Sequence, residues 1–208
     1  MHKTTSAMPG DPSPVPLKIV VGGGLGAGKT TFVGAVSEIT PLSTEERMTT
    51  YGEPVDSLDG LRADKNETTV AFDFGRRTFR GGPLPLELFL FGTPGQDRFV
   101  SLWEDICRGA VGAVIIIDTA RLAESFTAVS FFEAAGLPFL VALNRFDGAH
   151  HYPAEEVRDA LGLAPDVPVI SCDARNADQV ASVLITLADH ALSRFTSPPA
   201  PLPALDAR

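Results

Sequence analysis

The residues at positions 23–30 have the types and spacing needed to bind a phosphate group. They read Gly-Gly-Leu-Gly-Ala-Gly-Lys-Thr and fit the pattern G-x-x-x-x-G-K-[ST] at every fixed position. The glycines let the backbone turn sharply and point its N–H groups at phosphate oxygens. Lys29 is expected to reach the β- and γ-phosphates, and the Thr30 hydroxyl to bind Mg²⁺. The predicted phosphate contacts are Gly23, Gly24, Gly26, Ala27, Gly28, Lys29, Thr30 and Thr31.

The segments on either side place this loop between a strand and a helix. Residues 17–21 form a short apolar run typical of a buried parallel strand, and residues 31–36 carry apolar side chains at helical spacing. A helix N-terminus after the loop adds a favourable dipole for an anion. The alternative is a glycine-rich turn that binds nothing, and the flanking elements with the Lys-Thr pair favour a nucleotide site instead.

Three further polar segments follow predicted strands, which is where open α/β sheets bind their ligands. They read Phe-Gly-Thr-Pro-Gly-Gln at 91–96, Asn-Arg-Phe-Asp at 144–147 and Ser-Cys-Asp-Ala-Arg at 171–175. Each one alone is compatible with a plain polar turn, and its position after a strand favours a ligand site. A carboxylate at Asp147 can accept hydrogen bonds from guanine N1–H and N2–H₂, a donor pair that adenine lacks.

Strand and helix patterns alternate along the rest of the chain. Further strands are predicted at 69–74, 84–91, 110–117, 137–143 and 167–170, and further helices at 99–108, 122–135, 153–161 and 176–194. The first two of these strands are expected to form a hairpin. Residues 39–67 are polar and turn-rich and are predicted to be a long functional or mobile loop. The pattern predicts a doubly wound α/β sheet, mostly parallel with one antiparallel edge strand and helices on both faces.

The length and composition of the chain limit the number of domains and the classes of partner that it can have. The 208 residues suit one α/β domain, predicted at 17–195, between a disordered lead-in at 1–16 and a Pro-rich disordered tail at 196–208. A net charge of −9 argues against nucleic acid or an anionic membrane as a partner. Two cysteines and the lack of a membrane-length apolar run predict a cytoplasmic protein without direct membrane insertion, which only a partner would recruit to a membrane.

Over residues 17–195 the chain resembles a Ras-like small GTPase. Within that superfamily it is most similar to the bacterial MglA-type group, and closest to the GTP-binding proteins of actinobacterial conservon operons. The phrases Thr-Thr-Phe-Val-Gly-Ala-Val-Ser-Glu at 30–38 and Phe-Gly-Thr-Pro-Gly-Gln at 91–96 carry the narrower match. The resemblance implies a switch that binds GTP or GDP with Mg²⁺ and hydrolyses GTP slowly. It also implies two partners, a Roadblock/LC7-type regulator and a sensor-kinase-like protein.

The resemblance assigns roles around the γ-phosphate. Gly95 would give its N–H to the γ-phosphate, and Gln96 would orient the attacking water as the catalytic residue. Thr69 matches the threonine of the first switch that binds Mg²⁺, with Thr68 as the competing choice.

The resemblance also assigns roles around the base. Asn144 would brace the phosphate loop, and the Ala174 N–H would meet guanine O6. Asp173 stands where serine is usual, and Arg145 replaces the usual lysine. The residues of the segments at 144–147 and 171–175 that are assigned to nucleotide binding are Asn144, Arg145, Asp147, Asp173, Ala174 and Arg175.

The sequence departs from the family pattern near the γ-phosphate. Gly92 stands where most members carry an aspartate that holds Mg²⁺ through a water, which predicts weaker coupling to Mg²⁺ and faster loss of GDP. Leu25 replaces a usual glycine and is expected to crowd Gln96. No arginine precedes the predicted switch threonine, and Arg98 is favoured as a solvent-facing residue over an arginine finger. Intrinsic hydrolysis is expected on the order of 10⁻⁴ per second, with an activator adding several decades.

Two other functions stay open. A nucleotide-dependent scaffold with negligible hydrolysis is compatible with Gly92 and Leu25. An ATP-using P-loop enzyme such as a small kinase is the other, and Asp147 argues against it.

Overall fold

The structure is a computed structural model that describes residues 12–49, 67–81 and 84–196; at 43–49, 67–71, 97 and 195–196 it describes the backbone alone. Its strands are β1 (Val15–Gly22), β2 (Leu42–Thr49), β3 (Glu67–Phe79), β4 (Leu86–Gly92), β5 (Gly112–Ile117), β6 (Phe139–Asn144) and β7 (Val169–Cys172). Its helices are α1 (Lys29–Val36), α2 (Val100–Cys107), α3 (Phe126–Ala134), α4 (Ala154–Leu161) and α5 (Ala177–Thr196), with short 3₁₀ helices η1 (Asp97–Phe99) and η2 (Thr119–Ser125).

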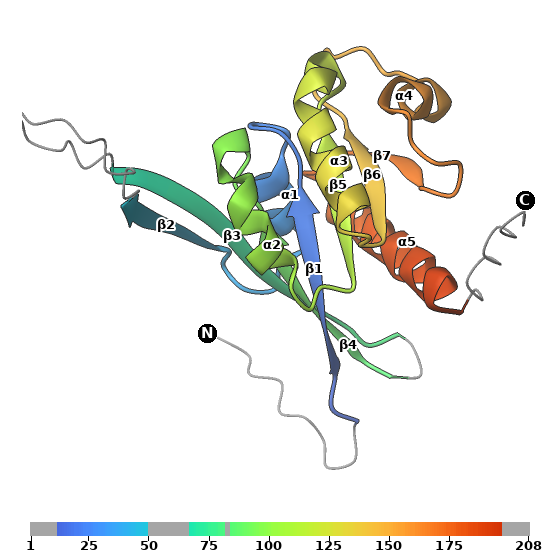
Figure 1. The fold of residues 1–208 in the computed structure, drawn as a ribbon. Coiled ribbons are helices and arrows are strands. Elements are labelled where there is room, and N and C mark those ends of the chain that lie inside the picture. The colour runs from blue at the N-terminus through green and yellow to red at the C-terminus, as the bar shows by residue number, and fades with distance from the viewer. Residues whose placement is uncertain (1–11, 50–66, 82–83, 197–208) are drawn as a thin grey trace, which may run out of the picture.

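The strands form one sheet in the order β2-β3-β4-β1-β5-β6-β7 (Figure 1). β4, β1, β5, β6 and β7 run parallel, and β3 runs antiparallel to both of its neighbours. The predicted mostly parallel α/β sheet with helices on both faces is therefore confirmed. The prediction was wrong in one respect: the antiparallel strand β3 does not lie at the edge of the sheet. β2 pairs with the outer side of β3 and forms the edge. β2 occupies part of the predicted 39–67 loop, and residues 50–66 of that loop lie outside the described residues.

The predicted hairpin is formed by β3 and β4. Their antiparallel register places Asp73 opposite Gly92 and Gly75 opposite Leu90. β3 runs on to Phe79, beyond the end of the strand predicted at 69–74. The hairpin thus brings the middle of β3 next to the carboxyl end of β4.

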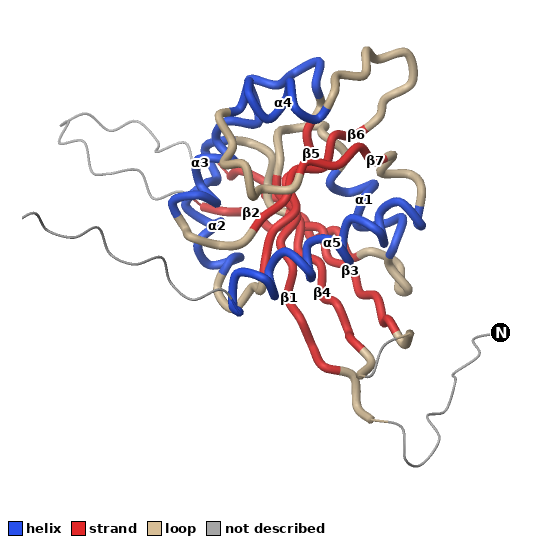
Figure 2. Tube along the Cα trace, turned by 90° about the vertical axis from the view of Figure 1, so that its right-hand side faces the viewer, coloured by secondary structure: helices blue, strands red, loops and turns tan. Residues whose placement is uncertain are grey.

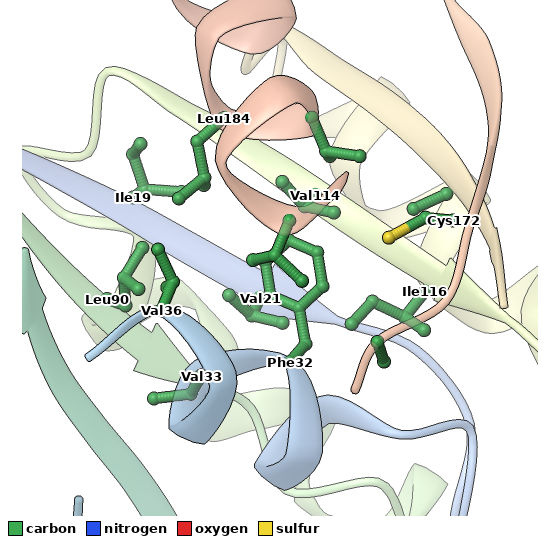
Figure 3. Close-up of a cluster of buried hydrophobic side chains, with 14 of the residues drawn as sticks. Ile19, Val21, Phe32, Val33, Val36, Leu90, Val114, Ile116, Cys172 and Leu184 are labelled. Atoms are coloured by element: carbon green, nitrogen blue, oxygen red, sulfur yellow. The ribbon is translucent and has the colours of Figure 1, made fainter. Parts of the chain in front are cut away.

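Helices cover the sheet on both sides and divide the core in two. Alternate residues of a strand point to opposite faces, so Val21 and Ile116 pack under α1 and α5, whereas Val20 and Ile117 pack toward α2, α3 and α4. Figure 2 shows the sheet seen between these helices, and Figure 3 shows Phe32 of α1 among the strand residues of the first cluster. This packing fixes α1 against β1 and so fixes the loop between them. No helix in the described part of the chain is long and apolar enough to cross a bilayer.

Candidate nucleotide-binding site

The predicted phosphate loop joins β1 to α1, and its glycines are required by its geometry. Gly23 and Gly28 have φ values of 135° and 108°, which residues with a side chain rarely adopt. A Cβ atom at Gly23 would lie 2.2 Å from the carbonyl oxygen of Ile116, and one at Gly28 would lie 2.4 Å from Asn144 Nδ2. The loop therefore packs directly on β5 and on the end of β6.

Lys29 lies buried inside this loop. Its ammonium donates hydrogen bonds to the carbonyl oxygens of Gly23 at 2.8 Å and Gly24 at 2.7 Å. Burial lowers the pKa of Lys29 to about 8, although the nearby carboxylates of Asp73 and Glu124 raise it. At neutral pH the loop thus holds a positive charge where phosphate oxygens are expected.

The loop after β4 lies against the phosphate loop. A Cβ atom at Gly95 would lie 2.6 Å from Lys29 Nζ and 2.9 Å from Leu25 Cα, so only a glycine allows this approach. Leu25 is 57% exposed and lines a cavity with Gly95, and Gln96, the next residue along the chain, is exposed. The structure thus brings Gly95 and Gln96 to the side of the loop where a γ-phosphate is expected.

Asp73 of β3 is a site residue that the sequence reasoning missed. Its Oδ2 atom accepts a hydrogen bond of 2.6 Å from the Thr30 hydroxyl. Asp73 lines a cavity of about 310 Å³ together with Lys29, Thr30 and Gly95. The available signal was an acidic residue within the otherwise apolar run of the strand at 69–74.

Thr69, the predicted switch threonine, lies in β3 with its backbone opposite Arg47 of β2. It is four residues from Asp73, which is about 13 Å along an extended strand. Its side chain lies outside the described residues, as does that of Thr68. In this conformation the strand carries Thr69 away from Thr30, so its binding of Mg²⁺ stays a prediction that requires this part of β3 to move.

The described residues offer few groups to a metal ion. Among them, no cluster of three or more His, Cys, Asp or Glu side chains could hold a metal. The Thr30 hydroxyl and the Asp73 carboxylate are nevertheless oxygen donors of the type that Mg²⁺ prefers. Since Mg²⁺ is commonly bound by one or two protein groups together with substrate phosphates, these residues fit that ion in the presence of a nucleotide.

Asn144, at the end of β6, connects the phosphate loop to the loop after β7. Its Nδ2 atom donates to the Ala27 carbonyl oxygen at 2.9 Å, and its Oδ1 atom accepts from the Ala174 N–H at 3.0 Å. β6 and β7 are parallel neighbours, so their carboxyl ends open on the same edge of the sheet. A cavity of about 230 Å³ lies there, lined by Thr31, Arg145, Asp147 and other residues predicted to bind the nucleotide.

The Asp147 carboxylate is engaged on both oxygens by Arg175. The two guanidinium nitrogens donate to Asp147 at 2.8 and 2.9 Å, and Arg175 Nε donates to Asp173 at 2.9 Å. The hydrogen bonds from Arg175 hold the pKa of both carboxyl groups below their usual range. Arg175 thus offers Asp147 the same kind of paired N–H donors as guanine would, so a base recognised by Asp147 would have to displace it.

Replacing Arg175 with alanine is therefore expected to raise the affinity for GDP a few-fold, since the base no longer competes with the guanidinium. The gain is small because the ion pair is exposed to solvent. Isothermal titration calorimetry measures the change. Arg108→Ala, which removes an exposed pair with Asp105 on α2, is the matched control and should leave the affinity unchanged. Weaker GDP binding by Arg175→Ala would mean that Arg175 contacts the nucleotide instead.

Arg121 of η2 is a second residue that the sequence did not single out. A Cβ atom at Gly26 would lie 2.9 Å from its Nη2 atom, so the guanidinium lies against the phosphate loop. Asp118 holds it by an ion pair of 3.0 Å. Arg98, the arginine considered from the sequence, instead lies over the Phe99 ring at 4.8 Å. Of Arg98 and Arg121, it is therefore Arg121 that lies against the phosphate loop.

The mostly parallel sheet with a phosphate loop after β1 has the fold of a P-loop G domain. The G domain of the T. maritima FeoB iron transporter has the same fold: it matches with a TM-score of 0.58 at 17% identity, covering 85% of this chain and 99% of that chain.

The chain belongs to the family described as conserved hypothetical ATP binding proteins, which it matches over residues 21–194. It is also similar to the Ras-related protein Rab-7b of Homo sapiens, at 28% identity over 88% of this chain and 86% of the relative. GTP-binding protein YPTM2 of Zea mays is 27% identical over 68% of this chain and 73% of the relative. Ras-related protein SEC4 of Saccharomyces cerevisiae is 26% identical over 58% of this chain and 59% of the relative.

Proposed function

We propose that this protein is a guanine-nucleotide switch that binds GTP and GDP with Mg²⁺ and slowly hydrolyses GTP. The observation that carries the proposal is the position of Asn144, which bonds the phosphate loop on one side and the Ala174 N–H on the other. One nucleotide can therefore reach the phosphate loop and Asp147 together. The relatives Rab-7b and YPTM2 support the same class of function.

Different residues of the site bind the phosphates, respond to the γ-phosphate and position the attacking water. Lys29 binds the β- and γ-phosphates and gives up its contacts with the loop carbonyls to do so. Gly95 donates its N–H to the γ-phosphate, so the loop after β4 responds to the loss of that group. Gln96 holds the attacking water in line. Mg²⁺, which Thr30 and Thr69 would hold, neutralises charge on the phosphates when it is bound.

Guanine is favoured over adenine, although the family description refers to ATP. Asp147 is a carboxylate whose two oxygens face a pair of N–H donors on Arg175. Guanine N1–H and N2–H₂ can replace that pair, whereas adenine offers no matching donors. An ATP-using enzyme would leave this carboxylate without a partner from the base.

The proposed partners follow from the resemblance to MglA-type and conservon GTPases. A Roadblock/LC7-type regulator and a sensor-kinase-like protein would contact two proposed switch segments, near 41–69 and 92–104, of which residues 50–66 lie outside the described residues. Such a partner would also recruit the protein to a membrane. Pull-down with protein loaded with GDP or with a non-hydrolysable GTP analogue tests this proposal, and equal recovery of both partners in the two states would contradict it.

Replacing Gln96 with leucine is expected to lower the rate of GTP hydrolysis by at least about tenfold, because the attacking water loses its positioning group. Single-turnover hydrolysis with purified regulator measures the effect. Arg108→Leu, at an exposed position beyond the segment near 92–104, is the control and should keep most of the rate. Equal hydrolysis by wild type and Gln96→Leu would remove Gln96 from the mechanism.

A scaffold that binds nucleotide without turnover is the second candidate. Leu25 favours it, because its side chain stands exposed at the mouth of the phosphate site next to Gly95. A side chain there competes for the space that Gln96 and an arginine from an activator need. Single-turnover hydrolysis separates the two functions, since a scaffold shows no product with or without the regulator.

A further inference from the structure

The space beside Gly92, where the family pattern has an aspartate, is filled by the side chain of Asp73. The two residues lie opposite each other in the β3–β4 register. A Cβ atom at Gly92 would lie 2.9 Å from Asp73 Cβ and 3.1 Å from Asp73 Oδ2. There is therefore room for only one carboxylate side chain between positions 73 and 92. Either β3 or β4 could carry it, and in this chain it is Asp73 of β3.

The close approach of β3 to α1 explains how Asp73 reaches the phosphate loop. Gly75 lies two residues along the strand and points to the same face as Asp73. A Cβ atom at Gly75 would lie 2.7 Å from Val33 Cγ1 and 3.2 Å from Ser37 Cβ, so the lack of a side chain lets the strand pack directly on α1. The Asp73 carboxylate is thereby carried to Thr30 in the first turn of the helix.

The contact between Asp73 and Thr30 leaves the Thr30 oxygen available to a metal. The hydroxyl donates its single proton to Asp73 Oδ2 at 2.6 Å, and its lone pairs remain free to bind a cation. A bond of this kind to a carboxylate is strong and fixes the orientation of a metal ligand. The second Asp73 oxygen can accept a hydrogen bond from a water on the metal.

We infer that Asp73 supplies the metal-site carboxylate that position 92 lacks, and that it couples Mg²⁺ to the bound nucleotide. The inference rests on the proposed nucleotide-binding function and names a residue of that site. Asp73 orients the Thr30 hydroxyl and adds one negative charge next to the ion. The weak coupling expected from Gly92 alone is thereby reversed, and Mg²⁺ should slow the release of GDP strongly.

The test compares the Mg²⁺ concentration that half-maximally slows release of a fluorescent GDP analogue. Asp73→Ala is expected to raise this concentration about 10–100-fold, the usual cost of losing a partner of a metal ligand. Gly92→Asp alone should not improve the coupling, because the new side chain collides with Asp73. The double variant Asp73→Ala/Gly92→Asp should recover most of the loss, since the carboxylate returns from β4.

Two further variants separate a metal role from a structural one. Asp73→Asn keeps an acceptor for the Thr30 hydroxyl but removes the charge. It should therefore lose Mg²⁺ coupling as Asp73→Ala does, while its thermal unfolding without nucleotide stays close to wild type. Glu87→Ala, which removes a carboxylate of β4 paired with Arg76 at 3.5 Å, is the control and should behave as wild type.

The outcomes distinguish this inference from the proposed function. Failure of the wild-type protein to bind the GDP analogue would overturn both. Normal binding with an Mg²⁺ response that is the same in wild type and Asp73→Ala would overturn the inference alone. A double variant that stays as impaired as Asp73→Ala would also overturn it, because the carboxylate would then be required at Asp73 for another reason.

Discussion

The Lys29→Ala variant is expected to bind GDP and GTP about 10²–10³-fold more weakly than wild type, the cost of leaving a buried charge without its partner. Lys29 is the buried ammonium of the phosphate loop, and it lines the same cavity as Thr30 and Gly95. Without it, the phosphates lose the positive charge of the loop, and the carbonyl oxygens of Gly23 and Gly24 lose their donor. Isothermal titration calorimetry of the nucleotide-free protein measures the loss.

Lys18→Ala is the matched control for this variant. Lys18 is a lysine of β1, the strand before the phosphate loop. Its ammonium donates to the Arg108 carbonyl oxygen at 3.0 Å and lies over the Phe91 ring. Its removal should leave the affinity for GDP unchanged. A folded Lys29→Ala variant with wild-type affinity would contradict the assignment of the phosphate site.

The Asp147→Asn variant is expected to lower the preference for guanine over adenine nucleotides by about 100-fold or more, as expected when a site loses its matched hydrogen bonds. An asparagine amide presents one acceptor and one donor group in place of two acceptors. Its NH₂ group would face a guanine N–H, so the guanine nucleotides lose affinity while ATP does not. Competition against a fluorescent GDP analogue gives both affinities in one titration.

Asp105→Asn provides the comparison for Asp147→Asn. Asp105 is an exposed aspartate of α2 that also pairs with an arginine, Arg108, at 2.9 Å. Its replacement removes the same charge far from the base and should leave the preference intact. Loss of preference in both variants would point to net charge, and retention in both would remove Asp147 from base recognition.

The fold was predictable because its signals are local. The apolar strands predicted at 110–117 and 137–143 are β5 and β6, which both lie inside the sheet, and the helix predicted at 153–161 is α4. The strand β2 was missed because Leu42–Thr49 is polar and lies at a sheet edge, where pairing with β3 supplies the hydrogen bonds without an apolar pattern. The sequence therefore favoured a loop.

Where one short segment carries the whole pattern, as at the phosphate loop and at 144–147, the sequence alone is enough to propose site residues. Asp73 and Arg121 were missed because their role depends on tertiary contacts: Asp73 reaches Thr30 across 43 positions of sequence, and Arg121 reaches Gly26 from another loop. No spacing rule connects such pairs. Thr69 begins the strand predicted at 69–74, but the extension of β3 back to Glu67 could not be inferred, because it depends on pairing with β2.

The most direct test of a guanine-nucleotide site is competition on the wild-type protein. A fluorescent GDP analogue is bound at equilibrium in the presence of Mg²⁺, and unlabelled GTP, GDP and ATP are titrated against it. GTP and GDP are expected to displace the analogue at similar concentrations, with ATP needing at least about a 100-fold excess. Displacement by ATP at the same concentration as GTP would contradict the assignment of Asp147 to guanine and would favour an ATP-binding protein.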